Sequence, residues 1–173
     1  MSRSVEDIEY LPNSGADVTL DSTDRAILRA LLEDSRSSQR ELSRIVGVAQ
    51  GTITNRLKKL ESQNIIQGYS VVLDPESVGW SMTIMAGLRI AKGKMINVQQ
   101  KIAADPRVFS VYDVTGDWDS MVLARVRDRA DLDDLTKTVF TLEGVTRSFT
   151  HVVLNTVKED GFAKPAPDKN NEE

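Results

Sequence analysis

The chain of 173 residues contains no cysteine and a single histidine, His151. The absence of cysteine excludes disulfide bonds and thiolate chemistry, and one histidine excludes a histidine-rich metal site within one chain. No apolar run reaches the ~18 residues that a membrane span needs. The first residues are acidic and lack the apolar stretch of a signal peptide, so we predict a cytoplasmic protein without a membrane partner.

The sequence also lacks the motifs of catalysis. Its ten glycines form no GxGxxG or other phosphate-binding loop, and no side chains have the spacing of a nucleophile with its base or of a metal site. We therefore predict no catalytic residue, no metal and no cofactor. The expected protein is not an enzyme.

What the sequence does contain is charge, unevenly placed. The net charge is −4, which disfavours a nucleic-acid partner. From Asp21 to Gly68, however, eight lysines and arginines stand against six acidic residues, so this segment is basic. The distribution of charge matters more than its sum for binding DNA.

Three helical patterns follow one another in this basic segment. Ser38 and Glu41 form a capping box that starts the second helix, and Gly47 follows that helix where a positive φ is needed. Asp21 or Ser22 caps the first helix. The third helix buries an apolar stripe at positions i, i+4 and i+7. The helices that we predict span about residues 23–33, 38–46 and 50–63.

The exposed face of the third helix is polar at its start and cationic further along. A recognition helix of a helix-turn-helix domain needs this order, because its first residues enter the major groove and its cations meet phosphates. Asn and Gln can bond adenine there, and Thr can contact the methyl group of thymine. A solvated helix with ordinary charge pairs is the alternative. The residues that we predict to contact DNA are Arg40, Gln50, Gly51, Thr52, Thr54, Asn55, Arg56, Lys58 and Lys59.

The remainder of the chain has a different pattern. Residues 65–73 read as an extended strand, a wing or hinge, and Asp74-Pro75 and Gly79 mark a boundary. The order from Trp80 onward is β-α-β-β-α-β, which predicts a ferredoxin-like domain. Its second helix is expected to continue through Leu142 to Gly144, and the last strand to cover 146–157. The fold class that we predict is α+β, with an N-terminal winged helix-turn-helix domain followed by this domain.

The strands of the predicted sheet carry apolar residues on both faces, as in Val152-Val153-Leu154. Helices cover only one face of such a sheet, so a second copy of the chain should cover the other. The domains that we predict are a disordered arm at 1–19, the helix-turn-helix domain at 20–66, a hinge at 67–79, the ferredoxin-like oligomerisation domain at 80–162, and a disordered tail at 163–173.

The segment from Leu20 to Tyr69 resembles, element for element, the N-terminal half of the Lrp/AsnC ("feast/famine") transcriptional regulators. Further parallels are the turn VTGDWD at 114–119, IQGYSVVLDPESVG after the third helix, GVTRSF before the last strand, and VVLNTVKED. The resemblance extends from Leu20 to Asp160. It implies a homodimer that assembles to a tetramer or octamer, binds double-stranded DNA at a roughly palindromic operator, and responds to a small molecule, usually a non-covalently bound amino acid.

The resemblance also implies where that effector binds. Backbone N–H groups of the 116–119 turn would hold an α-carboxylate, and a side-chain carboxylate would pair an ammonium. Two hydroxyl residues of the last strand would add contacts. The residues concerned are Gly116, Asp117, Trp118, Asp119, Ser148 and Thr150.

Plainer interpretations stay open for these residues. Asp117 and Asp119 are also good turn formers, Trp118 also suits an interface, and Ser148 and Thr150 also suit an ordinary sheet. Two other functions compete with an effector-responsive regulator. One is an enzyme of the siroheme decarboxylase type, which has a similar two-domain build, and the other is an architectural DNA-binding protein without an effector.

Overall fold

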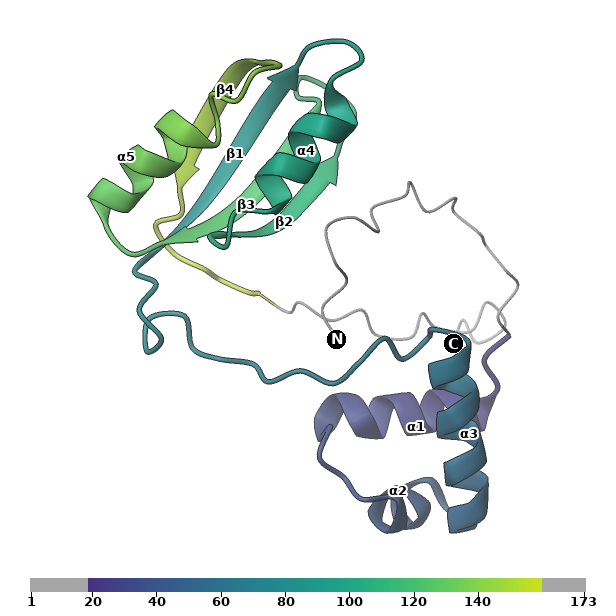
Figure 1. Cartoon of the computed structure of the whole chain (residues 1–173). Coiled ribbons are helices and arrows are strands. Elements are labelled where there is room, and N and C mark those ends of the chain that lie inside the picture. Colours follow the sequence, from purple (N-terminus) through teal and green to yellow (C-terminus); the bar gives the residue numbers. More distant parts are fainter. Residues whose placement is uncertain (1–18, 160–173) are drawn as a thin grey trace. The chain divides into compact units, whose positions relative to one another are not determined.

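The computed structural model describes residues 19–159 and divides them into two compact units between Val71 and Val72 (Figure 1). This division lies inside the range 67–79 that we assigned to the hinge. The predicted arm, apart from Thr19, and the predicted tail lie outside the described residues. Within the described part of the chain, no helix is both long and apolar enough to cross a membrane.

The N-terminal unit is a bundle of three helices, α1 (Ser22–Glu33), α2 (Gln39–Val46) and α3 (Gln50–Ser62). Asp21 and Asp24 form a capping box at α1, and Ser38 and Glu41 form the predicted one at α2. Gly47 ends α2 with φ = 77°, a conformation that glycine adopts at little cost. The core consists of the buried residues Ile27, Ala30, Leu42, Ile53, Leu57 and Leu60.

The prediction of a strand at 65–73 is wrong. The structure assigns no strand there, and the exposed fractions of Val71 and Val72 are 81% and 74%. A strand needs a neighbour for its backbone N–H and C=O groups, and none of the strands described in this chain pairs with the segment. The apolar residues of this segment therefore do not make a strand, because no neighbouring strand of the described chain supplies a ladder.

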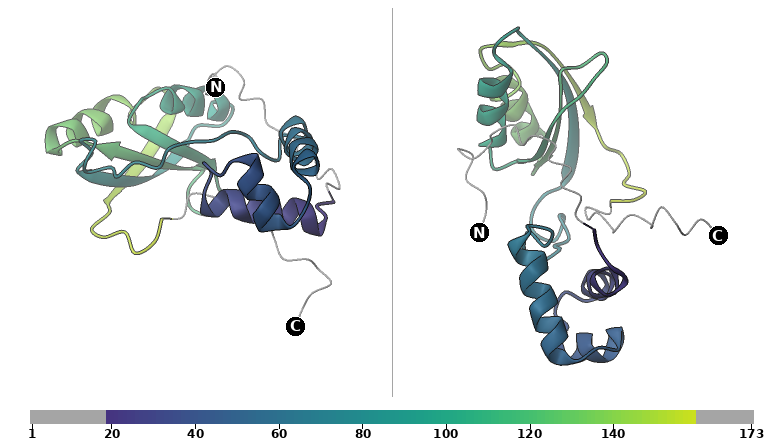
Figure 2. Two further views of the ribbon diagram at one scale, coloured as in Figure 1. Left: turned by 90° about the horizontal axis from the view of Figure 1, so that it is seen from below. Right: turned by 90° about the vertical axis from the view of Figure 1, so that its right-hand side faces the viewer.

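The C-terminal unit has the predicted order of elements. Its strands form a sheet in the order β2-β3-β1-β4, in which all neighbours are antiparallel. Both helices lie on one face of this sheet (Figures 1 and 2). The elements are β1 (Met82–Ile90), α4 (Met95–Ala103), β2 (Val108–Asp113), β3 (Ser120–Val126), α5 (Arg129–Thr138) and β4 (Val145–Val152).

Two element ends differ from the sequence-based prediction. Helix α5 ends at Thr138 instead of continuing to Leu142, although Phe140 and Val139 are buried just beyond it. Strand β4 ends at Val152 instead of Val157. Val152 pairs with Ile84, and the N–H of Val153 still donates to the carbonyl of Thr83, but β1 begins at Met82 and so cannot accompany the chain as far as Val157. Apolar side chains in both segments made the elements look longer than the hydrogen bonds allow.

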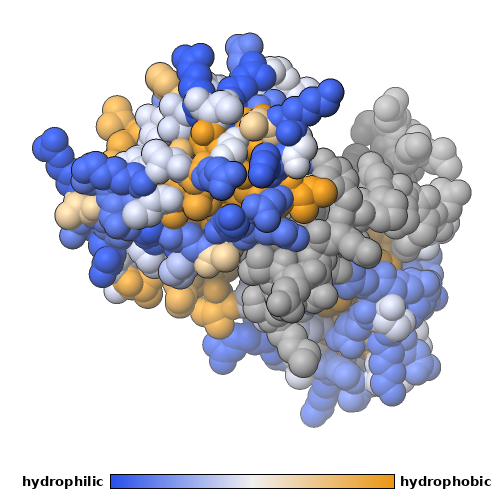
Figure 3. Space-filling model, turned by 45° about the horizontal axis from the view of Figure 1, so that its top comes forward, coloured by the Kyte–Doolittle hydropathy of each residue, from blue (hydrophilic) through white to orange (hydrophobic). Residues whose placement is uncertain are grey.

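The two faces of the sheet differ in what covers them. Ile84, Ala86 and Leu88 of β1 are fully buried beneath α4 and α5. Between them Met85 is 39% exposed, and Phe149 of β4, which pairs with Gly87, is 48% exposed. Orange hydrophobic side chains appear between blue hydrophilic ones on this unit in Figure 3. The expected cover by a second copy of the chain stays a prediction.

A network of ion pairs ties the turn before β2 to α5. Arg107 reaches Asp105, Asp131 and Asp134 at 2.7, 3.0 and 2.7 Å, and its side chain is 13% exposed. Asp131 also accepts from the side chain of Arg127 at 3.1 Å. Burial raises the pKa of Asp131, but hydrogen bonds from Arg127 and Arg107 outweigh it and hold this pKa at about 2. The charged carboxylate therefore stabilises the folded unit.

Acid should weaken this unit over a defined range of pH. Folding lowers the pKa of Asp131 from 3.8 to about 2, so its contribution is complete above about pH 4 and disappears as the pH falls through about 2. We expect Asp131→Asn to lower the free energy of unfolding by about 1–3 kcal/mol at neutral pH and to flatten the acid dependence. Urea unfolding down to about pH 2 measures both.

Asp133→Asn is the matched control, because Asp133 pairs only with the exposed Lys137 one turn away on α5 among the interactions of the described residues. An exposed pair of this kind contributes ~0–1 kcal/mol. An acid dependence that survives Asp131→Asn unchanged would show that other carboxylates produce it.

Candidate nucleic-acid interface and effector site

The face of α3 opposite its buried stripe is open. Gln50, Gly51, Asn55 and Lys58 are exposed there. A Cβ atom added to Gly51 would meet nothing within 4 Å, so neither α1 nor α2 obstructs the approach to this part of the helix. Arg40 is exposed on the preceding helix, α2. The predicted base-reading tip is thus accessible on the folded domain.

Both threonines that we predicted to contact DNA are half-buried, and the hydroxyl of Thr54 has partners within the domain. The hydroxyl of Thr54 donates to Oε1 of Gln39 at 2.6 Å and to the carbonyl of Gln50 at 3.1 Å. Thr52 is half-buried as well. Thr54 therefore joins α2 to α3, and Gln39, which the sequence analysis did not select, belongs to the site as its partner.

The structure gives Arg56 and Lys59 partners other than the expected phosphates. Nη1 of Arg56 contacts carboxylate oxygens of Asp21 and Asp24, and Nζ of Lys59 lies 3.6 Å from Asp24. Asp24 has no exposed side-chain surface. The hydrogen bond to Asp21 raises the pKa of Arg56. Both cations are therefore tied to α1, a role that the sequence analysis missed.

A signal for this pairing exists in the sequence. Asp21 and Asp24 are the two ends of one capping box. Such a box usually joins a Ser or Thr cap to Glu or Gln at its other end, whereas this one brings two short carboxylates together. A second, short aspartate that is buried requires a cation nearby. Arg56 and Lys59 are three residues apart and so lie on one flank of α3.

The turn from Gly116 to Asp119 is organised by backbone contacts. Gly116 has φ = 109°, and the N–H of Asp119 donates to the carbonyl of Leu88 at 2.9 Å. The carboxylate of Asp119 accepts from the N–H of Ile90 at 2.8 Å, where β1 and β4 shift register. Within one chain this carboxylate anchors the turn to β1, where Nη1 of Arg89 also lies 3.5 Å from it, whereas Asp117 is exposed.

Trp118 lies over the face of the sheet that α4 and α5 leave open. Its ring stacks on Phe149 with centroids 6.2 Å apart, and the guanidinium of Arg147 lies 5.3 Å from it. A Cβ atom at Gly87 would come within 2.6 Å of the Trp118 ring. Glycine at 87 therefore permits the indole to lie flat on β1.

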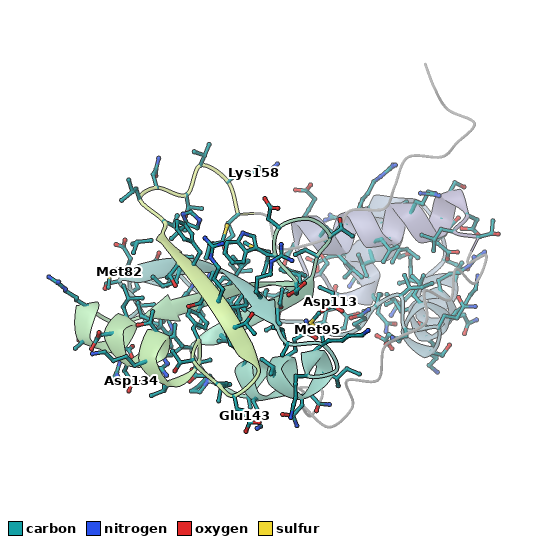
Figure 4. All side chains as sticks on the ribbon, turned by 90° about the horizontal axis from the view of Figure 1, so that it is seen from above. Met82, Met95, Asp113, Asp134, Glu143 and Lys158 are labelled. Atoms are coloured by element: carbon teal, nitrogen blue, oxygen red, sulfur yellow. The ribbon has the colours of Figure 1, made fainter. Side chains whose placement is uncertain are left out.

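Ser148 and Thr150 lie on the opposite face of the sheet from Trp118. Opposed residues of an antiparallel pair project to the same face, and these two oppose Leu88 and Ala86, which point toward the helices. Figure 4 shows side chains on both faces, with Met95 and Asp134 on the side of the helices. The six predicted effector residues therefore do not converge within one chain.

The chain matches two protein-family models. Residues 20–67 match a winged helix-turn-helix DNA-binding domain, and residues 83–161 match the Lrp/AsnC ligand binding domain. An uncharacterized HTH-type transcriptional regulator of Pyrococcus horikoshii is 45% identical over 146 residues, which are 84% of this chain and 99% of that protein.

Solved structures with similar folds include two complexes with an amino acid. One is a transcriptional regulator of Neisseria meningitidis bound to L-methionine, with a TM-score of 0.75 and 29% identity over 82% of this chain and 94% of that one. The other is a feast or famine regulatory protein of M. tuberculosis complexed with L-methionine, with a TM-score of 0.77 and 28% identity over 85% of this chain and 100% of that one.

Gly51→Ala should separate stability from DNA binding. Alanine favours a helix over glycine by roughly 0.5–1 kcal/mol, and the open space at Gly51 accommodates a methyl group without a clash. We expect a higher melting temperature and weaker binding to the cognate duplex, because the methyl group stands where the helix approaches the groove. Circular dichroism melting and fluorescence anisotropy measure the two effects. Equal or tighter DNA binding would remove Gly51 from the interface.

Proposed function

Because the chain belongs to the Lrp/AsnC family of HTH-type transcriptional regulators, we propose that it binds a specific double-stranded operator and that a free amino acid controls this binding. The named relatives are regulators and no enzyme is among them, so the decarboxylase alternative is set aside. The observation that carries the proposal is a ligand-binding domain that follows a winged helix-turn-helix domain in one chain.

Base recognition is assigned to the exposed tip of α3. Gln50 and Asn55 are exposed amides of the kind that bond adenine bidentately. Lys58, also exposed, is the cation on this face, and it can neutralise a phosphate. Two such helices in a dimer would require a roughly palindromic operator with half-sites about one helical turn apart.

The effector that we propose is an amino acid with an apolar side chain, and methionine is the first candidate. Two similar regulators have been solved with L-methionine, and a thioether makes favourable contacts with aromatic rings such as Trp118 and Phe149. Since Ser148 and Thr150 lie on the other face of the sheet, a pocket that uses both groups needs a second copy of the chain. We therefore assign the effector to a site between copies, in a dimer or a larger assembly.

The proposal is tested by fluorescence anisotropy on the DNA upstream of the protein's own gene, with and without each amino acid. We expect saturable binding that resists competitor DNA and shifts with methionine or a close analogue. Specific binding that no amino acid changes would refute the effector assignment and favour an architectural protein. Binding that competitor DNA abolishes at every salt concentration would refute the proposal that the protein recognises a specific operator.

Asn55→Ala should cost ~1–3 kcal/mol of binding free energy at the cognate site and relax the preference for one base pair. Its partner for comparison is Lys58→Ala, one turn along the same exposed face. That variant should weaken binding to every duplex and lower the slope of log K against log salt by about 1. Equal losses on cognate and random DNA for Asn55→Ala would show that Asn55 reads no base.

Asp119→Asn distinguishes an effector ligand from a turn former. The amide keeps an oxygen for the N–H of Ile90 but removes the charge that would pair an ammonium, an interaction of ~1.5–3 kcal/mol. We expect at least tenfold weaker methionine affinity by isothermal titration calorimetry, with DNA binding retained. Asp117→Asn, in the same turn, is the comparison variant. Unchanged methionine affinity in Asp119→Asn would leave Asp119 with its structural role alone.

A further inference from the structure

The acidic residues at the start of α1 contact Arg56 and Lys59 on the flank of α3. We infer that Asp24, assisted by Asp21, is a specificity-determining residue for DNA binding. By keeping Arg56 and Lys59 against α1, it withholds two positive charges from the phosphates of any duplex. The affinity for random DNA is thereby lowered, and recognition depends more on the exposed tip of α3. This inference rests on the proposed use of α3 as the DNA-reading helix.

The contacts of Asp24 are those of a carboxylate that cannot exchange its partners for water. Its Oδ1 lies 3.1 Å from Nη1 of Arg56, its Oδ2 lies 3.6 Å from Nζ of Lys59, and none of its side chain is exposed. An unpaired carboxylate in such a position would cost several kcal/mol. Pulling either cation away toward a phosphate therefore carries a penalty that an exposed pair would not impose.

Asp21 adds a second hold on one of these cations. The same Nη1 of Arg56 donates to its carboxylate, and the side chain of Asp21 is 46% exposed. The backbone N–H of Asp24 and the guanidinium of Arg56 keep the pKa of Asp21 below its usual value, although burial acts against them. Asp21 is thus charged at neutral pH beside Arg56.

The cations that are held remain near the surface. The side chains of Arg56 and Lys59 are 31% and 44% exposed, respectively. They neighbour the exposed residues Asn55 and Lys58 in sequence, so they lie on the flank of the face that would meet DNA. Because non-specific binding is almost wholly a matter of neutralised phosphates, two cations paired with two acids contribute little to it.

Charge-removing substitutions at the two acids test this inference. Asp24→Asn keeps the shape of the side chain and an oxygen for the capping box. Asp21→Asn keeps a good N-cap, since Asn and Asp are about equal there. Glu33→Gln is the matched control, because it removes the same charge at the exposed last residue of α1, away from the start of the helix where Asp21 and Asp24 lie.

The measurement is fluorescence anisotropy of each full-length variant on a random-sequence duplex and on the cognate duplex, over a series of salt concentrations. Each additional phosphate contact adds about 0.9 to the slope of log K against log salt, or roughly a threefold greater loss of affinity between about 50 and 200 mM. We expect the slope on random DNA to rise by about one to two for Asp24→Asn, which removes the charge that holds both cations. The rise should be smaller for Asp21→Asn, because Asp24 still holds Arg56 and Lys59 in that variant. The ratio of cognate to random affinity should fall in both.

Several outcomes would overturn the inference. A slope that equals that of the parent, or that of Glu33→Gln, would show that Asp24 and Asp21 only hold α1 to α3. Weaker binding of a folded Asp24→Asn to both duplexes would have the same meaning, and circular dichroism shows whether this variant is folded. If Asp24→Asn loses its fold, the slope of Asp21→Asn, whose half-exposed side chain lies outside the core, tests the inference instead. A parent protein that binds neither duplex would overturn the proposed function instead.

Discussion

The burial of one stripe of α3, formed by Ile53, Leu57 and Leu60, is the constraint on which the DNA-reading unit depends. These side chains are at most 8% exposed, and burying each one contributes roughly 1.5–3 kcal/mol. Once the stripe faces α1 and α2, the rotation of the helix about its axis is fixed. The tip that includes Asn55 must then face outward, and Arg56 must lie beside the acids of α1. The proposed base reading and the inferred charge restraint thus depend on the same packing.

The C-terminal unit depends on a similar one-sided arrangement. Helices α4 and α5 bury one face of the sheet and, within residues 19–159, no helix covers the other. Asp119 fixes the turn that sends Trp118 across this open face, where it meets Phe149. The proposed effector site between copies would use this aromatic surface, which a second copy and a ligand could share.

Most helices and strands and their order could be predicted from the sequence, because they depend on residues that are close together in the chain. Capping residues at Ser38 and Glu41, the glycine at 47, and the alternation in β1 each act within a few residues, and all are found in the structure. The order of elements in the C-terminal unit followed from the same kind of pattern. Each of these signals depends only on the backbone and on side chains a few residues away, so it can be recognised before the tertiary structure is known.

The features that were wrong or missed depend on contacts between distant parts of the chain. The segment 65–73 has strand-like residues but no partner strand in the described chain, and β4 ends at Val152, opposite Ile84, near the start of β1. The hold of Asp24 on Arg56 joins residues separated by 32 positions. The separation of Trp118 from Ser148 and Thr150 depends on the register of β1 with β4, which the sequence did not reveal.

The central claim is that this chain reads one operator through α3 and changes that reading when it binds an amino acid. Hydroxyl-radical footprinting of the region upstream of its own gene, titrated with methionine, tests it most directly. The account predicts two protected half-sites about 10 base pairs apart, with a pattern that changes as methionine is added. Uniform protection of the whole fragment, or none that survives competitor DNA, would contradict it.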